Sequence, residues 1–288
     1  MIESLLAKEA AEHALEGAAM KLLELYDLIG LQPEIRGKLT SVSDQIDLDQ
    51  IEPYLQKLTD IETAPQAYRY LKDLFGADKD NMAMLYCQLE CARRTYDRYQ
   101  EKHIAKAVYA DTMRCFTRFI EECRKKNGRM FFDRGWWTYR QISMNLFRIG
   151  ELEYQFKEYD GESVIALHIP SDADLSEKAV DESMRQAAIF FQTYYEEYKY
   201  KMYTCNSWLM SPALRPLLPE GSNILSFQRR FEIVQEDRED QEYIEWLFQV
   251  PVDTNRRELP ADSSLQKKVK ELLLSGGTIG SAYGIMEI

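Results

Sequence analysis

The sequence lacks any run of about 18 uncharged apolar residues, the length that a membrane-spanning helix needs. Residues 1–17 already carry several charges, so we expect no signal peptide, no membrane association and a cytoplasmic protein. A basic stripe is missing too. The 36 Lys and Arg are interspersed with 48 Asp and Glu, giving a formal charge of −12. Because this charge opposes the phosphate backbone, we expect no nucleic-acid partner.

Histidine is scarce, and the cysteines show no paired metal-binding spacing. The three histidines stand at positions 13, 103 and 168, which leaves no histidine-rich metal site. Five cysteines in a chain without an export signal indicate free thiols. Cys87 and Cys91 are four residues apart and could offer two ligands on one helix face, but a place in the core explains them more simply. We therefore expect no metal.

At 288 residues the chain is long enough for two domains with separate cores. In the first half, apolar residues such as Leu85 and Leu89 recur every three or four positions, which predicts an all-helical domain over 1–127. Beyond that point the period changes toward two, as in the alternation around Leu152. This change predicts a second domain with strands over 128–288.

A strand, helix, strand unit is the most informative part of the second half. SVIALHIPSD indicates a buried strand at 163–169, SEKAVDESMRQAAIFFQTYY an amphipathic helix, and YKYKMYTCNSW a second strand at 198–206. A right-handed crossover between parallel strands is the simplest connection. Ligands favour the carboxyl ends of such strands, where His168 and Cys205 lie.

Four further patterns complete the second half. An Asp-Gly turn at 160–161 indicates a hairpin, and alternating apolar residues at 225–233 and 244–250 indicate another. An amphipathic helix is expected at 263–274. The glycine-rich SGGTIGSAYG at 275–284 could cradle a phosphate, although a helix C-cap followed by a flexible tail explains it more simply.

The order of these elements, with a short helix at 212–218, is that of the GNAT acyltransferase fold. The sequence also resembles the bacterial GNAT-like acyltransferases that carry a separate helical N-terminal domain. The resemblance lies in six tracts: FDRGWWTYRQ, LFRIGELEY, HIPSDADLS, CNSWLMSPAL, SNILSF and ELPADSSLQ. They span most of residues 130–288. The resemblance implies an α+β protein, in which an all-helical N-terminal domain precedes a GNAT-like mixed β-sheet domain flanked by helices.

The same resemblance implies transfer of an acyl group from acyl-CoA to an amine on a small molecule or peptide. Superfamily members hold the coenzyme A diphosphate with a Gln/Arg-x-x-Gly-x-Gly/Ala loop. The equivalent loop here has no glycine and carries two carboxylates; it consists of Ser171, Asp172, Ala173, Asp174 and Leu175. Binding of the cofactor by this loop and helix capping by Ser171, Asp172 or Asp174 both stay open.

His168 is the candidate general base, because an imidazole titrates near neutrality. The alternative is a structural histidine that bonds the following loop. Cys205 and Ser207 should share one face of the partner strand, where either could protonate the leaving thiolate. A covalent Cys-His pair would need a third orienting group, which the spacing does not reveal. The tyrosine that superfamily members often place after this strand is absent from 207–223.

Two functions remain open at this stage. One is an acyltransferase with an unidentified acceptor, which His168 and Cys205 favour. The other is a catalytically inactive GNAT-like module that binds a ligand or a protein, which the acidic, glycine-free loop favours. Trp136 and Trp137 have two possible roles. They could contact the ligand, by stacking on an adenine or lining an acyl pocket, or they could be packing residues, which is the commoner role.

Overall fold

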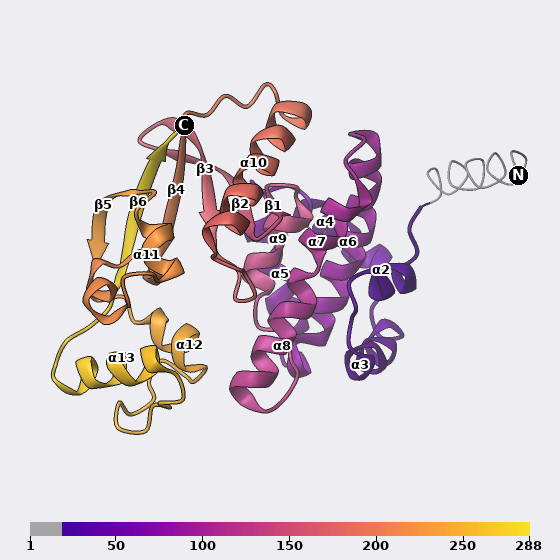
Figure 1. The fold of residues 1–288 in the computed structure, drawn as a ribbon. Helices are drawn as coiled ribbons and strands as arrows, with labels where there is room; N and C mark the ends of the chain where they lie inside the picture. Colours follow the sequence, from indigo (N-terminus) through magenta and orange to yellow (C-terminus); the bar gives the residue numbers. More distant parts are fainter. Residues whose placement is uncertain (1–18) are drawn as a thin grey trace, which may run out of the picture. The chain divides into compact units, whose positions relative to one another are not determined.

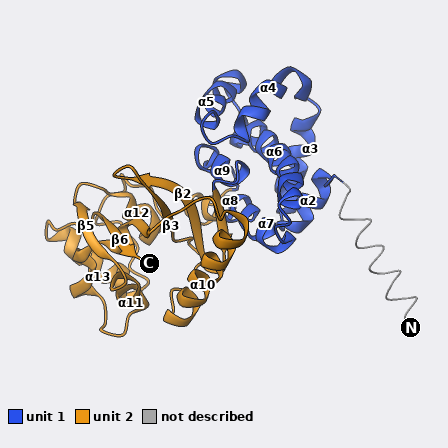
Figure 2. Ribbon diagram, turned by 90° about the horizontal axis from the view of Figure 1, so that it is seen from above, with its two compact units in different colours: residues 1–121, 130–145 blue, residues 122–129, 146–288 orange. Residues whose placement is uncertain are grey.

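The computed structural model describes residues 19–288, and the first 18 residues of the expected helical region lie outside them. The chain divides into two compact units (Figure 2). One contains the residues up to 121 together with 130–145, and the other contains 122–129 together with 146–288. Helix α8 (Cys115–Asn127) spans residues of both units, and its last turns belong to the second one.

The described part of the first unit is helical, as the sequence predicts. Besides the start of α8, it contains α2 (Leu22–Leu28), α3 (Pro33–Ser43), α4 (Leu48–Leu58), α5 (Ala64–Phe75), the 3₁₀ turn η1 (Lys79–Asn81), α6 (Met82–Glu101), α7 (Lys106–Met113) and α9 (Gly135–Ile142). The long α6 contacts α2, α3, α4, α5, α7 and α9. Its Leu85, Leu89, Ala92 and Tyr99 are fully buried, at the helical spacing that predicted this unit.

Polar side chains as well as apolar ones join α6 to α9. The Gln88 amide Nε2 donates to the Gly135 carbonyl at 2.7 Å, and the Thr138 hydroxyl donates to Gln88 Oε1. One helical turn further, the Thr95 hydroxyl donates to the Ile142 carbonyl at 2.8 Å. All of these side chains are buried. Because buried polar groups are costly when unpaired, these bonds specify how the two helices pack.

A mixed six-stranded sheet forms the centre of the second unit (Figure 1). The strands are β1 (Leu146–Ile149), β2 (Leu152–Tyr159), β3 (Glu162–His168), β4 (Met202–Ser207), β5 (Glu232–Asp237) and β6 (Ser281–Glu287), in the spatial order β1-β2-β3-β4-β6-β5. Helix α10 (Glu177–Tyr194) connects β3 to β4, which are the one parallel pair in this sheet. The predicted crossover unit and the hairpin at 160–161 are therefore confirmed, as is the α+β fold.

The register assigns the residues of the central strands to two faces. The face that we call the α10 face carries Leu152, Tyr154, Leu167, Tyr203, Cys205 and Gly284. We use this name because α10 contacts this face: the Ser183 hydroxyl forms a hydrogen bond with the Tyr154 phenol at 2.8 Å. The opposite face, which we call the polar face, carries Arg148, Glu153, Gln155, His168, Thr204, Asn206 and Tyr283. Chemistry-bearing side chains thus gather on the polar face.

The second hairpin predicted at 225–233 and 244–250 is wrong. The first segment begins in helix α11 (Asn223–Gln228) and continues into β5, and the second lies in helix α12 (Glu242–Phe248). Ile244 and Phe248 are buried four residues apart, a helical spacing that the alternation of apolar residues concealed. The antiparallel partner of β5 is β6 instead.

The flexible tail expected after the last helix is also wrong. Residues 281–287 form β6, which pairs with β4 on one side and β5 on the other. A glycine is needed at position 284, because a Cβ there would stand 2.8 Å from Met210 Cε and 2.9 Å from Phe231 Cβ. Gly284 therefore serves close packing in the middle of the sheet, whereas Gly276, with a φ of 87°, ends the last helix as the expected helix C-cap.

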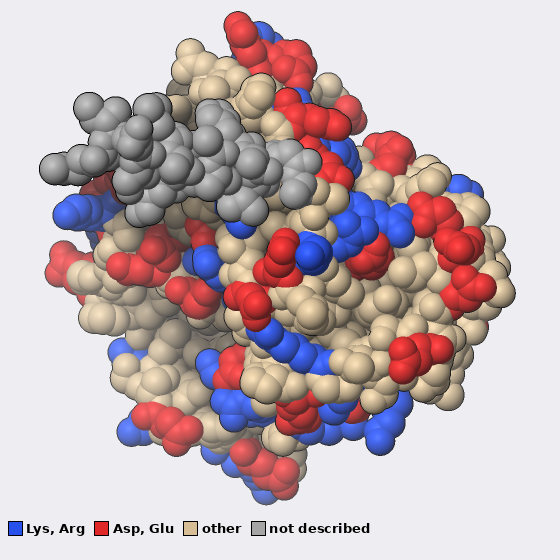
Figure 3. Space-filling view, turned by 90° about the vertical axis from the view of Figure 1, so that its right-hand side faces the viewer, with Lys and Arg blue, Asp and Glu red and all other residues tan. Residues whose placement is uncertain are grey.

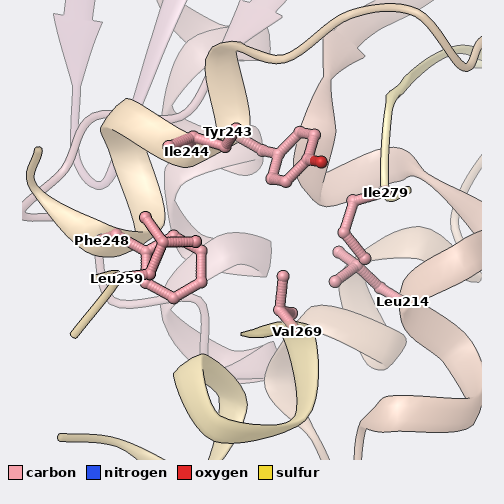
Figure 4. Packing of buried hydrophobic residues seen from close by; sticks show 7 residues of the cluster. All are labelled: Leu214, Tyr243, Ile244, Phe248, Leu259, Val269 and Ile279. Atoms are coloured by element: carbon pink, nitrogen blue, oxygen red, sulfur yellow. The ribbon is translucent and has the colours of Figure 1, made fainter. Parts of the chain in front are cut away.

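A small lobe, formed mainly by the chain between β5 and β6, has its own core (Figure 4). The predicted helix at 263–274 is confirmed as α13 (Ser264–Leu274), and its N-terminus has a capping box between Ser263 and Gln266. The 3₁₀ turns η2 (Trp208–Met210) and η3 (Pro212–Leu217) follow β4, where the short helix at 212–218 was expected. The core of the lobe comprises Leu214, Tyr243, Ile244, Phe248, Leu259, Val269 and Ile279.

Candidate active site

The carboxyl end of β3 places His168 at the last position of a buried strand. Four apolar residues in succession, from Val164 to Leu167, are buried on both faces of the sheet. Pro170 follows, and without an N–H it cannot extend the ladder. Pairing with β4 ends at Leu167 and Cys205, while β4 continues beside β6 to its last residue. Figure 1 shows the two parallel strands separating toward these ends.

His168 belongs to a row of polar residues that crosses three strands of the polar face. Arg148 is the register partner of Glu153, and Glu153 is the partner of His168. Directly paired residues hold their Cβ atoms about 4.5–5.5 Å apart, so a carboxylate and an imidazole are immediate neighbours here. Glu153 is 3% exposed, and a buried carboxylate in this position favours a charged or proton-sharing partner.

A hydrogen bond orients the His168 ring. Its Nε2 lies 2.9 Å from Oε1 of Gln155, two residues along β2 from Glu153. When Nε2 carries the ring proton, it donates to this oxygen and the lone pair is on Nδ1. The half-buried ring is thus held in one orientation by this contact, as a general base requires.

The structure does not bring Cys205 to His168. Cys205 and Ser207 share a face of β4, as predicted, but it is the α10 face, because Cys205 pairs with Leu167. The thiol is 1% exposed, and burial raises its pKa to about 12. Ser207 lies at the end of the strand, where its hydroxyl accepts a bond from the Leu209 N–H at 3.1 Å.

The loop after β3 is held by Arg148 of β1. Arg148 Nη1 binds the Asp172 carboxylate at 2.7 Å, and its Nε donates to the Gly150 carbonyl at 2.8 Å. The Ala173 N–H donates to the Pro170 carbonyl at 3.1 Å, which makes a tight turn. These contacts give the glycine-free loop a defined shape and neutralise one of its two carboxylates.

The second carboxylate of the loop turns toward the start of α10. Asp174 accepts bonds from the Ser176 N–H at 2.8 Å and from the Ser176 hydroxyl at 3.0 Å. Its own N–H donates to Oε2 of Glu151 at 2.8 Å. The Ser171 hydroxyl donates a hydrogen bond to the Glu122 carboxylate. Asp174 therefore has the local, cap-like role that the sequence left open, and Ser171 and Asp172 make longer-range contacts.

The first turn of α10 presents backbone N–H groups next to this loop. Its N-cap Ser176 makes no side-chain cap bond. Such a helix start attracts anions. Lys178 lies in the same turn, and Arg230 reaches the helix by binding Asp181 at 2.6 Å. A surface depression of about 570 Å³ lies along this part of α10, lined by Glu177, Lys178, Asp181, Glu182 and Arg185.

Cysteines and other metal-ligating groups do not cluster in the part of the chain that the structure describes. No three His, Cys, Asp or Glu side chains there form a group that could hold a metal ion. Cys87 and Cys91 are buried thiols on α6, and burial raises the pKa of Cys87 to about 12. Over residues 19–288, no helix is both long and apolar enough to cross a membrane. On the face shown in Figure 3, Lys and Arg are interspersed with Asp and Glu.

The paired tryptophans of α9 are partly covered by arginines. The Arg140 guanidinium lies 4.2 Å from the ring centre of Trp137, and Arg134 lies 5.9 Å from that of Trp136. The Trp136 side chain is 44% exposed. One ring therefore already has a cationic stacking partner, which is a packing role, whereas the other retains an open surface.

Sequence reasoning missed the residues that support the site from β1 and β2. Arg148, Glu151, Glu153 and Gln155 contact or neighbour the loop and His168 across the sheet. The alternation of polar and apolar residues at 151–156 did indicate which of them share a face. Nothing in that pattern gives the register that sets Glu153 beside the histidine.

Two family descriptions match the chain. An N-acyltransferase N-terminal domain matches residues 20–144, and a GNAT-like C-terminal domain matches residues 146–286. No curated protein matches.

Solved structures of acyltransferases have a similar fold. One is an acyltransferase in complex with decanoyl-CoA and teicoplanin, with a TM-score of 0.69 and 20% sequence identity, covering 93% of this chain and 99% of that one. Another is an acyltransferase mutant in complex with octanoyl-CoA, also with a TM-score of 0.69 and 20% identity, covering 93% and 100%. With its helical first unit, its mixed sheet and both domain matches, the chain belongs to the GNAT-like acyltransferases.

Proposed function

We propose that this protein transfers an acyl group from acyl-CoA to an amine. The observation that carries the proposal is His168, an imidazole oriented by a hydrogen bond at the end of β3, where the parallel strands separate. Membership of the GNAT-like acyltransferases supports the reaction class. Acyltransferases of similar fold that bind octanoyl-CoA and decanoyl-CoA support a coenzyme A thioester as the acyl donor.

In the proposed reaction, His168 acts as the general base. Nδ1 takes the proton that the amine loses as its nitrogen attacks the thioester carbonyl carbon. The Gln155 contact holds the opposite nitrogen and so keeps the ring in place. Glu153 is the direct cross-strand neighbour, and a carboxylate beside the ring stabilises the imidazolium that forms.

The residues around the loop fit the diphosphate of coenzyme A better than the loop sequence suggests. Asp172 is paired with Arg148, and Asp174 is turned onto Ser176, so both carboxylates are engaged within the protein. We place the diphosphate at Ser171–Leu175 and the first turn of α10, whose N–H groups have no side-chain cap. When bound, coenzyme A supplies the activated thioester.

In this proposal Ser207 donates its hydroxyl proton to the leaving thiolate and is reprotonated by water, while the proton taken up by His168 is released to solvent. It stands at the carboxyl end of β4, and its hydroxyl accepts one bond from Leu209, which leaves its own hydrogen to donate. Cys205 shares this face, but its thiol is buried. We therefore propose a packing role for Cys205.

The acceptor that we propose is an amine on a small molecule or a peptide. One acyltransferase of similar fold was crystallised with teicoplanin, which is reason to include large glycopeptides among the acceptors tested.

Replacing the proposed base tests this function. In His168→Ala, turnover of octanoyl-CoA with a panel of amines should fall by about 10²–10⁴, while calorimetric affinity for octanoyl-CoA stays near that of the wild type. His103→Asn is the matched control. His103 is exposed in the first unit and has a φ of 56°, which asparagine tolerates, so this variant should keep full turnover.

Three outcomes contradict parts of the proposal. Unchanged turnover in His168→Ala would make the histidine structural. Weaker acyl-CoA binding with unchanged turnover would move it to the cofactor site. If the wild type bound octanoyl-CoA but transferred its acyl group to no amine or to water alone, the binding-module alternative would replace the enzyme.

A further inference from the structure

A carboxylate of the protein already occupies part of the loop that we assign to the diphosphate. Glu151, in the turn between β1 and β2, accepts the Asp174 N–H at 2.8 Å. The Glu151 side chain is 32% exposed, so solvent reaches it. Loop N–H groups of this kind bind phosphate oxygens where a protein recognises an anion. The Glu151 carboxylate thus takes the place of an anionic ligand at this N–H.

Several carboxylates and the Arg148 guanidinium lie around the loop, so the charge of Glu151 affects how the loop would bind a diphosphate. Glu122 accepts from the serine of the loop, and Asp172 and Asp174 add two more carboxylates. Arg148 binds Asp172 and lies 3.8 Å from Glu151. Its side chain is 11% exposed, so its charge is poorly screened by water. Glu151 therefore adds repulsion toward a diphosphate and also draws on the Arg148 guanidinium.

We infer that Glu151 sets how strongly the site discriminates between coenzyme A thioesters and thioesters without a diphosphate. Its carboxylate competes with the diphosphate for the Asp174 N–H and for Arg148, so it weakens binding of the whole coenzyme. A pantetheine thioester has no diphosphate and meets no such competition. The inference rests on the proposed function, because it assumes that acyl-CoA binds at this loop.

Glu151→Gln separates the charge from the hydrogen bond. The glutamine keeps an oxygen that can accept the Asp174 N–H, so the loop keeps its shape, but the negative charge is gone. Removing one unit charge a few ångströms from a diphosphate at the protein surface should tighten binding about fivefold to tenfold. Glu151→Ala, which removes the competing acceptor as well, should tighten it at least as much.

The experiment is a calorimetric comparison of octanoyl-CoA, S-octanoyl-pantetheine and inorganic pyrophosphate on the wild type and both variants. We expect octanoyl-CoA and pyrophosphate to bind the variants more tightly, and the affinity for the pantetheine thioester to stay the same. Glu158→Gln is the matched control. It removes an exposed glutamate from the far end of β2 and should change none of the three affinities.

The possible results separate the two proposals. Equal affinity of wild type and variants for octanoyl-CoA, or weaker binding by the variants, would overturn the role of Glu151 and leave the proposed function standing. Tighter binding of all ligands, including the pantetheine thioester, would also overturn it, because the effect would not depend on the diphosphate. Absence of octanoyl-CoA binding in the wild type and every variant would refute the proposed function itself.

Discussion

Ser183 of α10 is the point at which the crossover helix is fixed to the sheet, and its removal should have a large effect. The buried hydroxyl donates to the Ile149 carbonyl at 2.6 Å and bonds the Tyr154 phenol at 2.8 Å. It also accepts the Leu152 N–H at 3.3 Å. One oxygen atom thus joins α10, β1 and β2.

The expected magnitude follows from the hydrogen bonds that Ser183→Ala removes. The buried Tyr154 phenol loses its partner, and an unsatisfied buried polar group costs about 1–3 kcal/mol. Ile149 and Leu152 remain paired in the β1–β2 ladder, but each loses its bond to the serine. Some of these groups will find water, so we expect a loss of about 2–4 kcal/mol in the free energy of unfolding. Tyr154→Phe should cost only about 1 kcal/mol, because Ser183 keeps its other bonds.

The double variant makes the argument sharper. Once Ser183 is replaced, the Tyr154 hydroxyl has no partner, so removing it as well costs little. The loss in the double variant should therefore be about 1 kcal/mol smaller than the sum of the two single losses. Hydrogen exchange of the β1, β2 and α10 amides, with urea unfolding, measures the effect in this unit. Thr193→Ala, on an exposed face of the same helix, should stay within about 0.5 kcal/mol. Additive losses, or a Ser183→Ala loss below about 0.5 kcal/mol, would refute the reasoning.

Three further predictions concern other positions. Because burial raises its pKa to about 12, the Cys205 thiol should resist iodoacetamide in the native protein and react after unfolding, and rapid native labelling in a peptide map would contradict this. Gly284→Ala should lower the free energy of unfolding by about 1–3 kcal/mol, because the new Cβ meets Met210 Cε at 2.8 Å; an unchanged urea midpoint would count against it. Burial alone would raise the pKa of Glu90, but hydrogen bonds to Arg93 and Arg94 hold this pKa below the ordinary 4.5. The contribution of Glu90 to the free energy of unfolding is therefore complete above pH 4.5 and is lost as the pH falls through the depressed pKa. In Glu90→Gln, the urea midpoint should fall less steeply with falling pH than in the wild type. An unaltered pH dependence would contradict this.

The central part of the second unit could be predicted because its strands are short, apolar and bounded by turn residues. The buried run that ends before Pro170 and the amphipathic pattern of α10 both have one simple interpretation. The segments at 225–233 and 244–250 do not. Their alternating apolar residues fit a strand as well as a short helix, and burial in a separate lobe decided for a helix at Ile244.

The site was predicted in part, and what was missed depends on register. His168 could be placed at a strand end from the sequence, because only the end of the strand had to be located. The position of Cys205 relative to His168 could not be predicted. Pairing of Leu167 with Cys205 places the thiol on the face opposite His168, and a register shift of one residue would place it on the same face. Glu153 and Arg148 come from strands whose register is likewise set by packing.

The position of β6 in the middle of the sheet has a consequence for how the protein folds. β6 separates β4 from β5, so the sheet cannot close until residues 281–287 have been synthesised. Until then β4 has an unpaired edge, and β4 and β5 lack the strand that lies between them. The helical unit depends mainly on contacts among earlier residues and can form first. During synthesis, the second unit is therefore the part of the chain most in need of protection from aggregation.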